Sequence, residues 1–301
     1  MTETTGFIDF VYNGEKFQTW YKVVGSLSPG VRPLVLLHGG PAVPSSYLSP
    51  HIELTESYGI PLIFYDQIGG GKSTHLRQKP SEFWTIDLFM DELDNVLRHF
   101  GIADDFDLYG HSWGGMLAAE YVATRGPRGL HRLVITSAPA SIALWESCTN
   151  MLLDHFPKDL AEVIRRNERE GTTDSKEYQD AIQIFYSKHI CQLDPWPKDL
   201  LDAFSIMEED PTVYRAMFGT SELNVTGSLR TWSIIKKLRD IACETLIMNG
   251  ADDEAQDECM QPFFDEIPKV KWVRFEKSSH MPFYEEKGRY LEILGSFLKR
   301  N

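Results

Sequence analysis

A serine flanked by two glycines stands between an apolar run and a helical stretch. Residues 110–114 read Gly-His-Ser-Trp-Gly, the spacing of a G-x-S-x-G motif. The strand expected before the motif and the helix expected after it are the context in which this pattern carries meaning. A turn this sharp leaves no room for side chains on both flanks, and it exposes the Ser112 hydroxyl at the carboxyl end of a sheet. We therefore interpret Ser112 as a catalytic nucleophile.

The loop at residues 38–41 reads His-Gly-Gly-Pro. It can stabilise the negative charge that develops on the substrate oxygen during acyl transfer. Its glycines let the backbone approach a substrate closely, so we expect Gly39 to contact the substrate. In this type of site, amides of this loop and of the residue after the nucleophile form the oxyanion hole. We assign these donors to Gly40 and Trp113. His38 is expected to brace the loop by hydrogen bonds.

A serine nucleophile of this kind needs an acid and a base, which follow it in the chain order Ser, Asp, His. Asp252 and Asp253 both lie just past an expected strand, and the residues alone leave the choice between them open. His280 lies just past the next expected strand and is the only histidine after the acidic loop. We therefore interpret His280 as the general base.

The elements that must position these residues alternate in type. An Asn-Gly pair at 13–14 favours an N-terminal hairpin, and strands then alternate with helices. We predict an α/β-hydrolase fold, with a mostly parallel sheet covered by helices on both faces. Its core comprises residues 1–139 and 238–301, and a helical cap spans 140–237. The expected strands lie at 33–37, 60–65, 106–109, 133–135, 245–248 and 270–275, and the expected helices at 86–100, 116–124, 157–171 and 290–299.

The composition limits the partners that we expect. The chain has 301 residues, of which 42% are hydrophobic and 25% charged, as is usual for globular enzymes. Its formal charge of −14 repels phosphate and anionic lipid, so we expect neither nucleic acid nor membrane as a partner. With no signal-peptide pattern and four widely spaced cysteines, we expect a cytoplasmic protein. Metal-ligand motifs are absent from the sequence, so we expect no metal or other cofactor.

Three motifs together resemble those of the proline iminopeptidase family and its relatives, the tricorn-interacting aminopeptidase and the L-amino-acid amidases. They are HGGP at 38–41, DQIGGGKS at 66–73 and GHSWGG at 110–115. The family forms read H-G-G-P-G, D-Q-R-G-C-G-R-S and G-G-S-W-G. The similarity continues through MFGTSE at 217–222 and GADDE at 250–254, so it covers nearly the whole chain.

This resemblance implies an exopeptidase or amidase that holds the free α-amino group of a small peptide or amino-acid amide. It places the catalytic acid at Asp253 and an amine-binding carboxylate at Glu254. A second amine-binding carboxylate comes from the cap in this family, and Glu222 matches its position. Two carboxylates around one ammonium form strong hydrogen bonds that orient the scissile carbonyl.

Three residues depart from the family motifs. Ala42 replaces the last Gly of H-G-G-P-G, Ile68 replaces an Arg, and His111 replaces the Gly beside the nucleophile. We expect Ala42 to narrow the mouth of the pocket. These departures bear on the preference for proline more than on catalysis.

Two other functions remain open on the sequence. An esterase or a hydrolase in a small-molecule biosynthetic pathway would use the same triad on another substrate. A ligand receptor could retain the hydrolase fold without catalysis, although the intact set of Ser, Asp and His argues against it.

Overall fold

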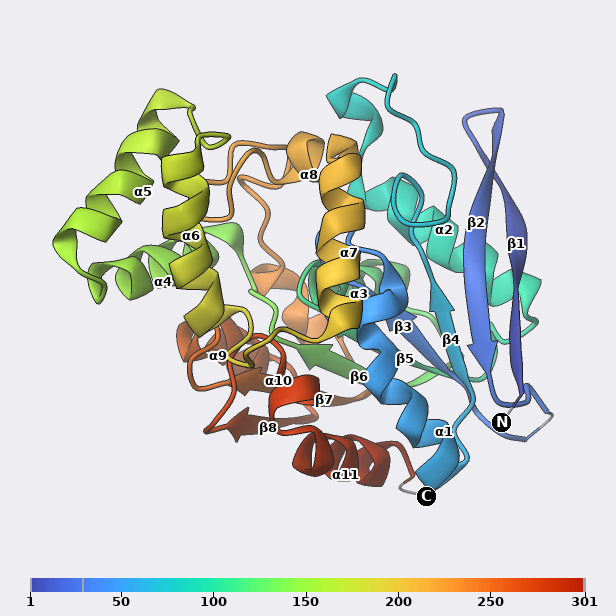
Figure 1. Cartoon of the computed structure of the whole chain (residues 1–301). Coiled ribbons are helices and arrows are strands. Elements are labelled where there is room, and N and C mark those ends of the chain that lie inside the picture. Colours follow the sequence, from blue (N-terminus) through green and yellow to red (C-terminus); the bar gives the residue numbers. More distant parts are fainter. Residues whose placement is uncertain (1, 29, 300–301) are drawn as a thin grey trace.

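The computed structural model describes residues 2–28 and 30–299, and within them the strands form one eight-stranded sheet (Figure 1). The strand order is β1-β2-β4-β3-β5-β6-β7-β8. The β1–β2 and β2–β4 pairs are antiparallel, and the remaining pairs are parallel. The strands are β1 (Glu3–Tyr12), β2 (Glu15–Val24), β3 (Leu34–Leu37), β4 (Leu62–Tyr65), β5 (Phe106–His111), β6 (Leu130–Thr136), β7 (Glu244–Gly250) and β8 (Val270–Phe275).

Helices cover both faces of this sheet, which explains why its central strands read as unbroken apolar runs. In β3, Val35 and Leu37 pack on the side of α2, α3 and α9, whereas Leu34 and Leu36 pack on the side of α1 and α11. The core helices are α1 (Glu53–Tyr58), α2 (Ile86–His99), α3 (Trp113–Arg125), α9 (Asp257–Glu266), α10 (Pro282–Glu285) and α11 (Lys287–Leu298), with 3₁₀ turns η1 (Ser45–Ile52), η2 (Ser81–Phe83) and η3 (Ile235–Asp240).

Between β6 and β7 lies a helical insertion, at the left and top of Figure 1. It contains α4 (Ile142–Asp154), α5 (Lys158–Glu170), α6 (Lys176–His189), α7 (Lys198–Glu209) and α8 (Thr212–Met217). The only strand pairing found in its described residues is an isolated bridge between Ser141 and Ser233. Helix α5 packs on α4 and α6, and the three share an apolar cluster. The assignment of residues 140–237 to a separate cap domain stays a prediction.

Most elements lie where the sequence places them. The hairpin turn has positive φ at both Asn13 and Gly14, as a tight two-residue turn requires. Helix α5 is bounded by Pro157 and by Gly171, whose φ is 67°. Helix α9 was not predicted from the sequence. Pro262 lies inside this helix, and a proline there normally indicates a helix end.

The buried carboxyl of Glu92 on α2 makes the stability of this fold depend on pH. It accepts hydrogen bonds from the Thr19 hydroxyl and the Ile68 amide. Burial, the largest cause, raises the pKa of Glu92 from 4.5 to about 8. Because the folded protein holds this proton more tightly than the unfolded chain, the stabilisation is complete below pH 4.5 and is lost as the pH rises towards 8.

We expect Glu92→Gln to reduce this pH dependence, because the glutamine oxygen accepts the same hydrogen bonds without a charge. The melting temperature of the wild type should fall by several degrees more between pH 6 and pH 9 than that of the variant. Thermal melts at both values measure this, with the exposed Asp87→Asn on the same helix as the control. Equal falls in wild type and Glu92→Gln would contradict the assignment.

Candidate active site

Ser112 lies at a strained turn between β5 and α3. Its φ of 55° and ψ of −123° fall in a region that residues other than glycine rarely adopt. A Cβ on Gly110 would lie 2.1 Å from the Gly114 carbonyl oxygen, and one on Gly114 would lie 2.2 Å from the Leu37 carbonyl oxygen. Both glycines of the motif are therefore required by close backbone approach, as the sequence indicated.

The glycine loop after β3 lies directly against the Ser112 turn. A Cβ on Gly39 would be 3.1 Å from Ser112 Cβ, and Gly39, Gly40 and Ser112 line one cavity. The Gly39 amide already donates to the Tyr47 hydroxyl at 2.7 Å. Trp113 opens α3, so its amide belongs to the first helical turn, whose N–H groups have no partner within a helix. These positions suit Gly40 and Trp113 as amide donors to a substrate oxygen.

His38 braces this loop, as expected from the sequence. Its Nδ1 donates to the Gly39 carbonyl oxygen at 2.9 Å, and its Nε2 accepts from the Gln67 amide at 2.9 Å. The Gln67 side chain in turn accepts from the Trp113 indole at 2.9 Å. Gln67 thus ties the Asp-Gln motif to the nucleophile turn.

The structure brings Asp253 to His280 and places Asp252 elsewhere. Asp253 Oδ1 lies 2.7 Å from His280 Nδ1 and also accepts from the Ala255 amide at 2.8 Å. Asp253 is completely buried. The Asp252 carboxylate instead accepts from the Gln192 side chain at 2.9 Å.

The end of α6 contacts the loops of both Asp253 and His280. His189 Nδ1 donates to the Asp252 carbonyl oxygen at 2.7 Å, and the His189 carbonyl accepts from the His280 amide at 3.2 Å. Three residues on, the Gln192 amide donates to Glu285 at 2.7 Å. The helical insertion is thereby joined to the acid loop and the base loop at one corner.

Two buried carboxyl groups face each other beside His280. Glu254 Oε1 lies 3.7 Å from His280 Nε2, and Glu222 and Tyr214 line the same cavity beside Glu254. Among the described residues, the Oε2 atoms of Glu222 and Glu254 have neither solvent contact nor a hydrogen-bond partner. Burial raises the pKa of Glu222, and burial together with the neighbouring Glu222 charge raises that of Glu254 further. Two ionised carboxylates this close are costly unless a proton or another cation joins them.

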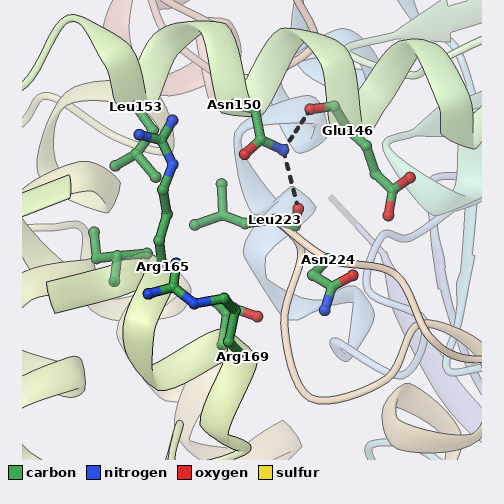
Figure 2. Close-up of a pocket in the computed structure, with 9 residues that line it drawn as sticks. Glu146, Asn150, Leu153, Arg165, Arg169, Leu223 and Asn224 are labelled. Carbon is green, nitrogen blue, oxygen red and sulfur yellow. Dashed lines mark hydrogen bonds between the residues drawn. The ribbon is translucent and has the colours of Figure 1, made fainter. Parts of the chain in front are cut away.

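Helix α4 holds the loop that carries Glu222. The Trp145 indole donates to the Glu222 carbonyl at 2.9 Å, and the Val225 amide donates to the Glu146 carboxylate at 2.7 Å. Figure 2 shows Asn150 between α4 and this loop, donating to the carbonyls of Glu146 and Leu223. Behind the loop a pocket of about 390 Å³ is lined in part by two arginines of α5 (Arg165 and Arg169).

The cavity at Ser112 is narrow and its wall on the side of the helical insertion is largely apolar. It leaves about 30 Å³ of water-accessible space. Ala42 does not belong to its wall; it is buried, with φ of 73°, so the expectation that it narrows the mouth is wrong. Sequence analysis also missed several lining residues, which carry no motif: Val43, Tyr47, Ile190, Phe204, Met207, Tyr214 and Met281.

Within the described ranges, no group of His, Cys, Asp and Glu is arranged to hold a metal ion. In the same ranges, no helix has the length and apolar character needed to cross a membrane.

Comparisons with known proteins show the fold and the family. Residues 32–287 match the family model described as the alpha/beta hydrolase fold. A curated protein named proline iminopeptidase, from Heyndrickxia coagulans, is 35% identical, with 98% of each chain covered. The chain belongs to the proline iminopeptidase family of α/β-hydrolases. This confirms the resemblance seen in the motifs, and a serine hydrolase is what the family implies.

Two solved structures superpose closely on the chain. The proline iminopeptidase of Mycobacterium smegmatis has a TM-score of 0.90 at 36% identity, covering 98% of this chain and 97% of its own. The crystal structure of VinJ has a TM-score of 0.93 at 42% identity and covers 98% of both chains.

Proposed function

We propose that this protein is an aminopeptidase or amino-acid amidase that cleaves the bond next to a free α-amino group. One observation carries the proposal. Glu222 and Glu254 form a buried carboxyl pair, and Glu254 Oε1 lies 3.7 Å from His280 Nε2. The Oε2 atom of each residue has no hydrogen-bond partner among the described residues. A substrate ammonium at this place would satisfy them by charge-assisted hydrogen bonds. It would also fix the scissile carbonyl relative to Ser112.

In the proposed reaction, the Ser112 oxygen attacks the carbonyl carbon while His280 Nε2 takes the hydroxyl proton. Asp253 keeps the other imidazole proton on Nδ1 and stabilises the imidazolium that forms. The amides of Gly40 and Trp113 donate to the carbonyl oxygen as it becomes negative. His280 returns its proton to the leaving amine, and water then attacks the acyl-enzyme by the same steps, which releases the acid and restores Ser112.

The proposed substrates are small peptides and amino-acid amides. The apolar wall contributed by Ile190, Phe204 and Met207 suits an apolar side chain better than a charged one. The names of the relatives point to an N-terminal proline, whose protonated amine has two N–H donors for the two carboxylates. A primary amine has three donors and can use the same pair.

We expect Glu222→Gln and Glu254→Gln to impair mainly substrates with a free α-amine. Truncating one partner of a buried charge pair costs about 2–5 kcal/mol. Because Gln keeps the shape, the lower half of that range applies, or about 30- to 300-fold in kcat/KM. The measurement compares one aminoacyl anilide with its N-acetylated twin in wild type and both variants.

The acetylated twin is the control, because it brings no ammonium. It should be a poor substrate for the wild type and barely change in the variants. Equal losses of kcat/KM on both substrates would mean that the carboxyl pair does not bind the substrate amine. Efficient wild-type cleavage of the acetylated twin would favour an esterase or a biosynthetic-pathway hydrolase instead.

A further inference from the structure

A chain of hydrogen bonds runs through the wall of the cavity beside the proposed triad. The Gly39 amide donates to the Tyr47 hydroxyl at 2.7 Å, and that hydroxyl lies 2.8 Å from His111 Nδ1. On the other side of the ring, His111 Nε2 lies 2.9 Å from the His280 carbonyl oxygen. Tyr47 and His111 are each 1% exposed, so water does not compete for these bonds. These hydrogen bonds join the loops that follow β3 and β8 to the β5–α3 turn, through His111 at the end of β5.

The direction of each bond follows from the groups at the two ends. A carbonyl oxygen only accepts, so His111 Nε2 carries a proton. A backbone amide only donates, so Tyr47 accepts from Gly39 and gives its own proton to His111 Nδ1. Every donor and acceptor is then matched, provided that His111 is neutral. Burial lowers the pKa of His111 well below its ordinary value, and the neighbouring His280 lowers it further, so this ring stays neutral.

We propose that His111 is a positioning residue that holds the oxyanion loop through Tyr47, and the His280 loop directly, in register with Ser112. This inference rests on the proposed triad. The three joined loops supply the oxyanion donor, the nucleophile and the base, and a displacement of about 1 Å among such groups can cost on the order of 100-fold in rate. The His111 and His280 rings lie 4.7 Å apart, so a neutral His111 also avoids opposing the imidazolium charge on His280.

Two single variants break this chain of hydrogen bonds and still keep an aromatic ring at the substituted position. His111→Phe leaves the Tyr47 hydroxyl without its acceptor and the His280 carbonyl without its donor. Tyr47→Phe removes one hydroxyl and frees the Gly39 amide. The matched control is His51→Phe, because His51 is also fully buried and its ring lies 5.1 Å from Phe283, the same distance as the His111 ring. The bond of His51 goes to the Leu48 carbonyl of its own 3₁₀ turn and not to these loops.

We expect His111→Phe and Tyr47→Phe each to lower kcat on an aminoacyl anilide by 10- to 100-fold, with KM changed less than threefold. The rate at which a fluorophosphonate labels Ser112 should fall in parallel, because this probe brings no amine. The double variant should lose no more than about threefold beyond the worse single variant, since both changes break one chain. His51→Phe should keep kcat within threefold of wild type.

Three results would overturn the inference: kcat within twofold of wild type in Tyr47→Phe, an equal loss in His51→Phe, or losses that multiply in the double variant. Should His111→Phe not fold, Tyr47→Phe still decides, because its ring packing is unchanged. Ser112→Ala separates this inference from the proposed function. If Ser112→Ala remains active, the assignment of the triad itself is rejected. If Ser112→Ala is inactive and Tyr47→Phe keeps the kcat of the wild type, only the role of His111 is rejected.

Discussion

Ser112→Ala is expected to lower kcat by about 10⁶, because a nucleophile, its base and its acid act as a unit and the loss of the nucleophile removes the acyl-enzyme route. Ser112 stands at a turn whose glycines admit no side chain, and it lines the cavity together with Gly40 and His280. The residual rate would come from substrate binding and the oxyanion donors alone. Initial rates on an aminoacyl anilide measure the loss.

A fluorophosphonate provides the second readout for this variant. The wild type should be labelled rapidly on Ser112, and Ser112→Ala should not be labelled at all. Retention of even a tenth of wild-type turnover would reject Ser112 as the nucleophile. Absence of labelling in the wild type would favour a ligand receptor that retains the hydrolase fold.

Asp253→Asn is expected to lower kcat by roughly 10⁴, whereas Asp252→Asn should cost less than about tenfold. Asp253 Oδ1 lies 2.7 Å from His280 Nδ1, so the asparagine amide would disturb the imidazole tautomer that takes the serine proton. Asp252 directs its carboxylate to Gln192, away from the imidazole. The two variants remove the same charge from adjacent residues, so each is a control for the other.

The comparison needs only kcat for the two variants and a melting temperature for each, to show that both are folded. A larger loss in Asp252→Asn than in Asp253→Asn would mean that the acid loop adopts another register in solution. Similar small losses in both would mean that His280 does not depend on a carboxylate.

The sequence predicts the core and the backbone of the Ser112 turn well because each depends on local rules. The glycines at 110 and 114 are required by backbone contacts of 2.1–2.2 Å that a Cβ would make. The buried strands appear as apolar runs because helices cover both faces. By contrast, Asp252 and Asp253 differ only in which way one turn directs each side chain, and that direction is not encoded in their types.

The remaining parts of the site escaped sequence analysis for a physical reason. Tyr47 reaches Gly39 from a 3₁₀ turn, and Phe204 and Met207 reach the cavity from α7. The Tyr47 contact depends on how this turn folds back on the glycine loop, and the contacts of Phe204 and Met207 depend on how the helical insertion packs on the core. No fixed spacing in the sequence records either arrangement. Ala42 shows the opposite error: its place in a motif predicted a contact with the cavity, but its backbone turns the methyl group into the core.

Residues 189–192, the corner at the end of α6, and helix α5 should tolerate sequence change to different degrees. Residues 189–192 bond to the loops of Asp253 and His280, so a change there reaches the chemistry as well as the substrate. Helix α5 packs on α4 and α6, away from both loops, and can be exchanged between relatives with less consequence for catalysis. A chimera that keeps this four-residue corner and takes α5 from another member of the family is therefore expected to keep the bonds that join the insertion to the Asp253 and His280 loops. New substrate preferences can evolve by that route without rebuilding the catalytic machinery.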